Sequence, residues 1–398
     1  MLETDFLIVG AGIVGLGIGR ELARRYHESK IIIIEKESMA AFHASGRNSG
    51  VVHAGFYYHS SSLKAKFTVA GNKALTQYCM DNGLKINPCG KVVVAKNEDE
   101  LSGIYELKRR GDENGVDLQL IDEKELSEIE PNAKTFEKAL FSPTTSSVNP
   151  KEVCQHIAAG YPPNVHILFN REFLKLNDRI AITNKEKIKF KYLYNAAGLY
   201  ADRIAHFFDV GKEYTLLPFK GIYLAHNDNN LLKRHVYPVP NLKNPFLGVH
   251  FTKTVDHHVK IGPTAIPAFW RENYDFKNRF RGNEFLEIIS WQARLFWNNN
   301  FNFRSLAFTE ARKYSRKYFI RESANLLKHL DVNNFGDYLT PGIRAQLLNK
   351  LTGELVMDFV VENGKNSTHV LNSVSPAFTT GFPFAEFIVT ESEKNFSV

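Results

Sequence analysis

Residues 6–15 read Phe6-Leu7-Ile8-Val9-Gly10-Ala11-Gly12-Ile13-Val14-Gly15, and this stretch decides the fold class. The continuous apolar run at 6–9 is typical of a buried parallel strand, and a glycine-rich turn follows it directly. Val14, Ile18 and Leu22 then recur at intervals of four residues, as on the buried face of a helix. A second apolar run at 31–34 completes a strand–helix–strand unit, so the sequence predicts an α/β fold.

The three glycines of the turn follow the pattern GxGxxG, which predicts a binding site for a dinucleotide. In such a turn Gly10 makes the tight bend, Gly12 lets a pyrophosphate approach the backbone, and Gly15 lets the helix pack on the strand. Ile13 and Val14 begin the helix, whose unpaired N–H groups and partial positive charge attract phosphate.

An acidic residue at the end of the second strand supports this interpretation. Glu35 lies twenty residues after Gly15, where its carboxylate can accept hydrogen bonds from both ribose hydroxyls. Lys36 follows it, but the acid at the strand end disfavours a 2′-phosphate. The alternative is a glycine-rich turn in an unrelated α/β protein, which leaves the combination of strand, turn and acid unexplained. The pattern alone does not distinguish FAD from NAD.

The composition indicates a folded protein of more than one domain. The chain has 398 residues, against a usual domain size of about 100–200 residues. Hydrophobic residues make up 43% and charged residues 23%, which excludes a disordered or fibrous chain. The spacing of Cys79, Cys89 and Cys154 fits no metal site or disulfide framework, so we expect reduced thiols and no metal.

The distribution of charge and apolar residues narrows the partners and the location. The net charge is +7, and because the cations are spread along the chain we expect an acidic small molecule rather than nucleic acid. The first strand begins at Phe6, which leaves no room for a signal peptide, and no run reaches the ~18 apolar residues of a membrane span. We therefore expect a cytoplasmic protein.

One segment, 304–328, suggests a second location. It interleaves basic and aromatic residues, namely Arg312, Lys313, Tyr314, Arg316, Lys317, Tyr318, Phe319, Ile320 and Arg321. Such a segment could make peripheral contact with an anionic membrane, at the inner face of the cell membrane. The alternative is a solvated, charge-rich helix, since the aromatic residues form no single stripe.

A longer stretch after the second strand resembles a known family. Ser45-Gly46-Arg47-Asn48-Ser49-Gly50-Val51-Val52-His53-Ala54-Gly55 is similar to the corresponding segment of the L-2-hydroxyglutarate dehydrogenase family, within the D-amino-acid-oxidase-like FAD-dependent oxidoreductases. Further blocks resemble the family in the same order, namely residues 195–202, 237–240, 246–252, 262–265, 342–346 and 375–377. The sequence departs from the family at Lys220, Ile222 and the bulky stretch 378–383. The resemblance implies FAD as the cofactor.

The order of predicted elements and the resemblance together predict two domains. A discontinuous, Rossmann-type FAD-binding domain with a parallel sheet is expected from residues 1–84, 144–215 and 335–398. An inserted, mostly antiparallel α+β substrate-binding domain is expected from residues 85–143 and 216–334.

The resemblance also assigns residues to the cofactor. Ser45, Arg47, Asn48 and Ser49 are expected to wrap the pyrophosphate and the ribityl chain, and His53 to lie beside the flavin ring. Further contacts are expected from a second flavin fingerprint at Ala197 and Gly198, and from Ser375 and Pro376 before the last helix.

The expected reaction is oxidation of a 2-hydroxy acid, most simply L-2-hydroxyglutarate to 2-oxoglutarate. A base takes the hydroxyl proton while hydride leaves C2 for flavin N5, and electrons pass to a quinone or oxygen. Strand alternation at 249–252 directs His250 away from its apolar neighbours, so His250 is the first candidate base and His53 the second. Arg344 is expected to hold one carboxylate of this di-acid, and Tyr237 or Lys220 the other.

Two alternatives stay open. One is another enzyme of the superfamily, a glycerol-3-phosphate dehydrogenase or an amino-acid oxidase. The other is a dinucleotide-binding module without redox turnover. For His53 and His250 the alternative is a structural histidine hydrogen-bonded in the core.

Overall fold

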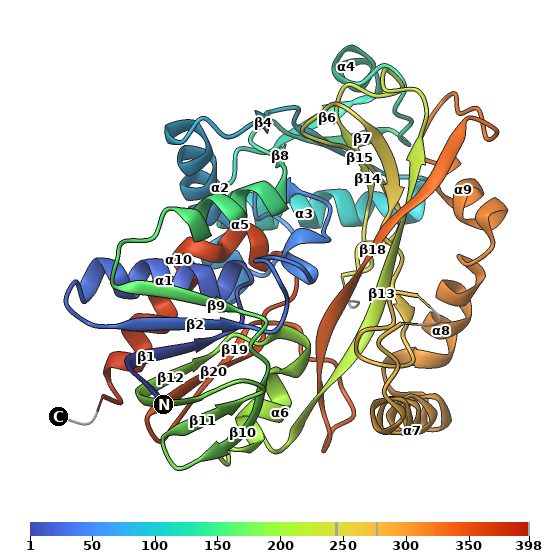
Figure 1. Ribbon diagram of the computed structural model, residues 1–398. Coiled ribbons are helices and arrows are strands. Elements are labelled where there is room, and N and C mark those ends of the chain that lie inside the picture. The colour runs from blue at the N-terminus through green and yellow to red at the C-terminus, as the bar shows by residue number, and fades with distance from the viewer. Residues whose placement is uncertain (243–245, 276–277, 397–398) are drawn as a thin grey trace. The chain divides into compact units, whose positions relative to one another are not determined.

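The computed structural model describes residues 1–242, 246–275 and 278–396 (Figure 1). The chain divides into two compact units. Unit 1 comprises Met1–Asn48, Pro150–Leu217 and Arg344–Val398, and unit 2 comprises Ser49–Asn149 and Pro218–Ile343. Each unit has its own sheet, and the glycine fingerprint lies in unit 1.

Unit 1 is built on a mixed sheet of eight strands. Its parallel strands are β9 (Val165–Phe169), β2 (Ile31–Glu35), β1 (Leu2–Val9), β12 (Lys187–Asn195) and β20 (Ser367–Asn372). Its antiparallel strands are β10 (Phe173–Asn177), β11 (Ile180–Thr183) and β19 (Val360–Gly364). The apolar runs predicted as buried strands are β1 and β2, and Leu7, Val9, Ile32 and Ile34 lie in the core. The predicted α/β fold is confirmed.

The helices of unit 1 are α1 (Ile13–Arg25), α5 (Pro150–Ala159), α6 (Ala201–His206) and α10 (Ala377–Glu393). The helices α1 and α10 pack along each other, and glycine permits their close approach (Figure 1). A Cβ atom on Gly17 would lie 2.7 Å from the carbonyl oxygen of Gly381. This contact accounts for a glycine inside α1, where it costs about 1 kcal/mol relative to alanine.

Unit 2 contains a nine-stranded, mostly antiparallel sheet and a small three-stranded sheet. The large sheet holds β17 (Ile266–Pro267), β13 (Tyr214–His226), β16 (Val259–Gly262), β15 (His250–Lys253), β14 (His235–Pro238), β5 (Lys91–Val94), β7 (Lys138–Ser142) and β6 (Gln119–Asp122), and β18 (Phe335–Asn349) pairs with β13. The small sheet holds β3 (Val51–Val52), β8 (Ser146–Val148) and β4 (Ile86–Asn87). The helices are α2 (Leu63–Asp81), α3 (Leu101–Glu113), α4 (Glu123–Ile129), α7 (Gly282–Asn298), α8 (Phe303–Arg312) and α9 (Arg316–Ala324).

The two faces of the large sheet differ in chemistry. Strand alternation places Val92, Val236, Phe251 and Ile261 on one face, where they form the main core of unit 2. The registers of β5, β14, β15 and β16 set the opposite residues side by side on the other face. This second face, here called the polar face, carries Lys91, His235, Tyr237, His250, Thr252 and Lys260.

The unit boundaries differ from the predicted domain boundaries. Residues 49–84 and 144–149 belong to unit 2, because β3 and β4 both pair with β8 and because α2 packs on β3 and β4. Compactness does not test which residues bind a cofactor, so the assignment of residues 1–84, 144–215 and 335–398 to FAD stays a prediction. Residues 243–245 and 276–277 of the predicted substrate domain lie outside the described residues.

The basic, aromatic segment 304–328 forms most of α8 and all of α9. Phe319 and Ile320 lie in the core of unit 2, and Lys313 is buried against Glu310. These three side chains are therefore not available to a membrane surface, and membrane contact by the rest of the segment stays a prediction. Among the described residues, no helix is both long enough and apolar enough to cross a membrane.

Candidate active site

The glycine turn between β1 and α1 has the geometry of a phosphate cradle. Gly10 has a φ of 107°, and a Cβ atom there would lie 2.5 Å from the carbonyl oxygen of Ala196. A Cβ atom on Gly15 would lie 1.9 Å from the carbonyl oxygen of Gly10. The turn therefore excludes side chains at both positions. The turn also lies against Ala196, which follows β12 and leads into Ala197 and Gly198. The two predicted fingerprints are therefore neighbours in unit 1.

The segment that follows β2 folds around the start of α1. Ser45 Oγ accepts a hydrogen bond of 2.9 Å from the backbone N–H of Ile13, at the first turn of the helix. Arg47 Nε donates to the carbonyl oxygen of Phe42 at 2.7 Å, and Asn48 Nδ2 donates to the carbonyl oxygen of Ser45 at 2.7 Å. The hydroxyl group of Ser45 thus lies at the end of α1 that attracts phosphate, and Arg47 and Asn48 hold the backbone of the same segment.

Glu35 lies where the sequence predicts, at the end of β2. Its carboxylate accepts hydrogen bonds from the backbone N–H groups of Ala11 at 2.8 Å and Glu37 at 3.0 Å. A carboxylate has about four acceptor positions, so acceptors remain for ribose hydroxyls. Lys36 Nζ lies 4.5 Å from the centre of the Tyr200 ring. These donors, acceptors and side-chain-free glycines fit a dinucleotide such as FAD.

Replacement of Glu35 by Ala is expected to weaken FAD binding by roughly ten- to a hundredfold, because the ribose loses its acceptor and the N–H of Ala11 loses its partner. The quenching of flavin fluorescence as apoprotein is titrated would measure the affinity. Glu3→Ala, which removes an exposed carboxylate on β1, is the control. Equal affinity in both variants would remove Glu35 from the cofactor site.

The remaining predicted residues of unit 1 are Arg344, Ser375 and Pro376. Arg344 is half-buried within β18, and Ser375 and Pro376 directly precede α10, which begins at Ala377. The backbone N–H groups in the first turn of α10 favour a negative charge beside them. Ser49 is assigned to unit 2, where its Oγ accepts a hydrogen bond from the N–H of Val51 at 3.4 Å.

In unit 2, the predicted base His250 is the first residue of β15. It is buried on the polar face, and its ring stacks on Tyr237 with the ring centroids 3.7 Å apart. His250 Nδ1 lies 2.9 Å from the carbonyl oxygen of Gly248. Because a carbonyl can only accept, Nδ1 carries the proton and Nε2 keeps the lone pair that a base needs. Sequence alternation predicted this orientation, and Val249 and Phe251 lie in the core as expected.

His53, the second candidate base, is buried in the loop after β3. Burial, reinforced by the positive charge of Lys91 and by His235, lowers the pKa of His53 well below its usual value. Its imidazole is therefore neutral at neutral pH. Asn72 Nδ2 donates to the carbonyl oxygen of His53 at 3.1 Å and fixes the loop from the side of α2.

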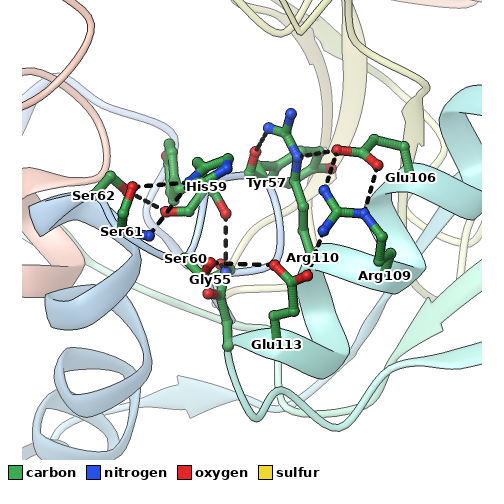
Figure 2. Close-up of polar contacts among 12 residues, drawn as sticks. Gly55, Tyr57, His59, Ser60, Ser61, Ser62, Glu106, Arg109, Arg110 and Glu113 are labelled. Carbon is green, nitrogen blue, oxygen red and sulfur yellow. Dashed lines mark hydrogen bonds and ion pairs between the residues drawn. The ribbon is translucent and has the colours of Figure 1, made fainter.

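The continuation of this loop is held by α3. Arg110 Nη1 donates to the carbonyl oxygen of Tyr57 at 3.0 Å, and Glu106 accepts from Arg110 Nε at 2.7 Å (Figure 2). Asn114 Nδ2 donates at 3.0 Å to the carbonyl oxygens of both Gly55 and Tyr58. The backbone of this loop is therefore fixed, and with it the place of Tyr57.

The predicted substrate residues of unit 2 are only partly brought together. Tyr237 contacts His250, as described above. Lys220 is buried on β13, where Thr264 Oγ1 donates to its carbonyl oxygen at 2.9 Å, and burial lowers the pKa of its ammonium. Sequence reasoning missed Lys91, which is completely buried beside Tyr237. The available signal was a lysine at the head of the apolar run Lys91-Val92-Val93-Val94.

The fold and the cradle define an α/β dinucleotide-binding protein with a second, mostly antiparallel unit. Residues 5–386 match the family described as FAD dependent oxidoreductase, so the chain belongs to this DAO family and is an FAD-dependent oxidoreductase.

Relatives within the family are similar over nearly their full length. The mitochondrial L-2-hydroxyglutarate dehydrogenase of Dictyostelium discoideum is 33% identical over 418 residues, which cover 98% of this chain and 93% of the relative. The L-2-hydroxyglutarate dehydrogenase of Escherichia coli K12 is 32% identical over 397 residues, covering 97% and 92%. The FAD-bound L-alpha-glycerophosphate oxidase of Mycoplasma pneumoniae has the same fold, with a TM-score of 0.75 at 24% identity, covering 100% of this chain and 95% of that one.

Proposed function

We propose that this enzyme oxidises L-2-hydroxyglutarate to 2-oxoglutarate and passes the electrons to a quinone-like acceptor. The observation that carries the reaction type is the buried His250, whose Nδ1 is tied to a carbonyl so that Nε2 can take a proton. The choice of substrate is supported by the full-length similarity to L-2-hydroxyglutarate dehydrogenases. A cytoplasmic enzyme in peripheral contact with a membrane would meet such an acceptor directly.

In the proposed reaction each of these residues has its own role. FAD, when bound, supplies the acceptor for the two electrons of the oxidation. His250 Nε2 removes the proton of the substrate hydroxyl, and the stacked ring of Tyr237 keeps the imidazole in one plane. Arg344 holds a carboxylate of the substrate with two parallel hydrogen bonds and so orients the carbon that is oxidised. The first turn of α10, after Ser375 and Pro376, favours negative charge near it.

An anaerobic titration tests this proposal. The purified enzyme is expected to show the absorbance of oxidised flavin, and L-2-hydroxyglutarate is expected to bleach it within the time of one turnover. The D-enantiomer, glycerol 3-phosphate and a neutral amino acid serve as controls. The D-enantiomer tests whether the enzyme selects one enantiomer, and the other two compounds test the two other reactions of the superfamily.

Each outcome decides between the alternatives. Bleaching by the L-acid alone supports the proposal. The L-acid could leave the flavin oxidised while glycerol 3-phosphate or the amino acid reduces it. This result would show that the enzyme acts on another class of substrate. Flavin that no compound of the set reduces would contradict the proposed substrate and favour a module that binds FAD without turnover.

A further inference from the structure

Lys91, at the start of β5, is a buried lysine to which the described residues offer no hydrogen-bonded acceptor. Its side chain has 0% exposure, and its Nζ has no hydrogen-bond partner among the residues that the structure describes. Instead Nζ lies over three aromatic rings, 4.5 Å from the centre of Phe56, 4.6 Å from that of Tyr57 and 4.9 Å from that of Tyr237. Ring faces attract a cation but accept no conventional hydrogen bond, so its three N–H donors are left without acceptors.

A second donor lies beside it. The hydroxyl group of Tyr57 is buried and, within the described part of the chain, also has no hydrogen-bond partner. Buried polar groups are nearly always hydrogen-bonded, and buried charges are nearly always paired or bound to a ligand. Two unsatisfied donors without an acceptor have the chemistry of an anion-binding site.

We propose that Lys91 and Tyr57 form the subsite that receives one carboxylate of the substrate, and that this subsite selects dicarboxylates over monocarboxylates. The inference rests on the proposed function, because it assigns the second acidic group of that substrate to named side chains. It replaces the earlier expectation that Tyr237 or Lys220 holds this carboxylate.

The position of Lys91 on the sheet connects this subsite to the proposed base. Lys91 pairs with His235 in the register of β5 and β14, and it lies on the polar face together with His250. The Tyr237 ring contacts Lys91 Nζ and also stacks on the His250 ring. A carboxylate bound to Lys91 would therefore lie one aromatic ring away from the imidazole.

An anion can reach Lys91 only if one of the three aromatic rings around Nζ moves. Phe56 and Tyr57 belong to the loop that follows β3, whereas Tyr237 is fixed within a strand. Because Arg110 holds the carbonyl oxygen of Tyr57, we assign this movement to a rotation of the Tyr57 side chain while its backbone stays in place. Such a rotation replaces the ring face over Lys91 by the hydroxyl group, which then donates to the same anion.

The pH dependence follows from the charge of Lys91. Burial lowers the pKa of Lys91 to about 7. The ammonium form binds the anion, so the affinity for a dicarboxylate is expected to be highest near about pH 6, where Lys91 is charged and both carboxylates are ionised, and to fall by up to about tenfold per pH unit above pH 7. Among the described residues, the titratable groups that interact with Lys91 are His53, Tyr57, His235 and Tyr237. Next to these groups lie Tyr58, Cys89, His250, Lys253 and Lys260.

The test compares two ligands that cannot be oxidised. Glutarate carries two carboxylates and pentanoate carries one, and each is titrated into the FAD-loaded enzyme by calorimetry and by the shift in flavin absorbance. Lys91→Met is expected to weaken glutarate binding at least tenfold at pH 6, where Lys91 is charged, and to change pentanoate binding less than twofold. The decline of glutarate affinity above pH 7 is expected to disappear.

Lys253→Met is the matched control. Lys253 is a buried lysine of the same sheet on the opposite face, and its Nζ donates to the carbonyl oxygens of Asn229 at 2.9 Å and Leu232 at 2.7 Å. Its replacement is expected to lower stability and to leave the ratio of glutarate to pentanoate affinity unchanged. Tyr57→Phe removes a single hydroxyl and is expected to weaken glutarate binding about threefold or more without affecting pentanoate.

Equal losses for glutarate and pentanoate in Lys91→Met, or the same loss of selectivity in Lys253→Met, would overturn the inference. If Lys91→Met does not retain FAD, unchanged selectivity in Tyr57→Phe would overturn it instead. These measurements need no turnover. A flavin that L-2-hydroxyglutarate fails to bleach, with glutarate selectivity still dependent on Lys91, would refute the proposed oxidation and keep the dicarboxylate subsite.

Discussion

Replacement of His250 by Gln is expected to lower turnover of L-2-hydroxyglutarate by about a hundredfold to ten-thousandfold, while the enzyme keeps its flavin. Glutamine is of similar size, so the strand and the ring of Tyr237 are expected to keep their places. What it lacks is a nitrogen lone pair that takes a proton near neutral pH. Stopped-flow measurement of flavin bleaching isolates this step from the later reaction with the acceptor.

The matched control for this variant is His226→Gln. His226 is also a buried histidine of unit 2, on β13, where its Nδ1 lies 3.1 Å from the backbone N–H of Asp228. Its replacement is expected to change stability but to leave the rate of bleaching within about threefold. A His250→Gln enzyme that is reduced as fast as the parent would remove His250 from the mechanism and leave His53 as the candidate base.

Replacement of Gly15 by Ala is expected to abolish stable FAD binding, with a loss of affinity of at least about a hundredfold. The added Cβ atom would lie 1.9 Å from the carbonyl oxygen of Gly10 and 3.1 Å from its carbonyl carbon. No side-chain rotation relieves a clash with backbone, so α1 must move away from β1 and the phosphate cradle opens. The measurement is the ratio of flavin to protein absorbance after purification, followed by titration with added FAD.

Gly282→Ala is the control for the glycine substitution. Gly282 begins α7, and a Cβ atom there would have no neighbour within 4 Å, so flavin content and folding are expected to stay as in the parent. A Gly15→Ala protein that purifies with a full complement of FAD would show that the turn tolerates the shift and that the cradle is not formed as described.

Local sequence patterns were sufficient for the parts of the site that depend on neighbours in the chain. The turn after β1 follows from GxGxxG between an apolar run and a helical pattern, because its geometry is fixed within a few residues. The orientation of His250 follows from alternation with Val249 and Phe251, because a strand directs successive side chains to opposite faces. Neither inference needs to know which strand lies next to which.

The environment of Lys91 could not be predicted in this way. Its contacts depend on the parallel pairing of β5 with β14, and the unit 1 segment Pro150–Leu217 lies between these two strands in the sequence. The register between β5 and β14 determines whether the ammonium group of Lys91 contacts an acidic residue, solvent or a ring such as that of Tyr237. From the sequence alone Lys91 is a lysine at the start of a strand, and lysine side chains are mostly exposed to solvent.

The assignment of residues 49–84 shows the same limit. Their first residues continue the segment around Ser45, so the sequence groups them with the nucleotide-binding part. The pairing of β3 with β8 places these residues in compact unit 2, while their predicted role in binding FAD stays a prediction. Pairing between distant strands is a property of the whole chain, and the local pattern of Val51 and Val52 contains no information about it.

The packing of α10 on α1 has a consequence for how this enzyme is made. The nucleotide-binding unit begins with β1 and α1, but β20 and α10, which add to its sheet and pack on its first helix, are synthesised long after them. Until then the face of α1 at Gly17, which packs against Gly381 of α10, has no covering helix. Contacts between segments that are far apart in a chain form slowly, since a long loop must close first. Cofactor capture in the cell should therefore follow synthesis of α10, and the intermediate that waits for α10 is the form most exposed to proteases and chaperones.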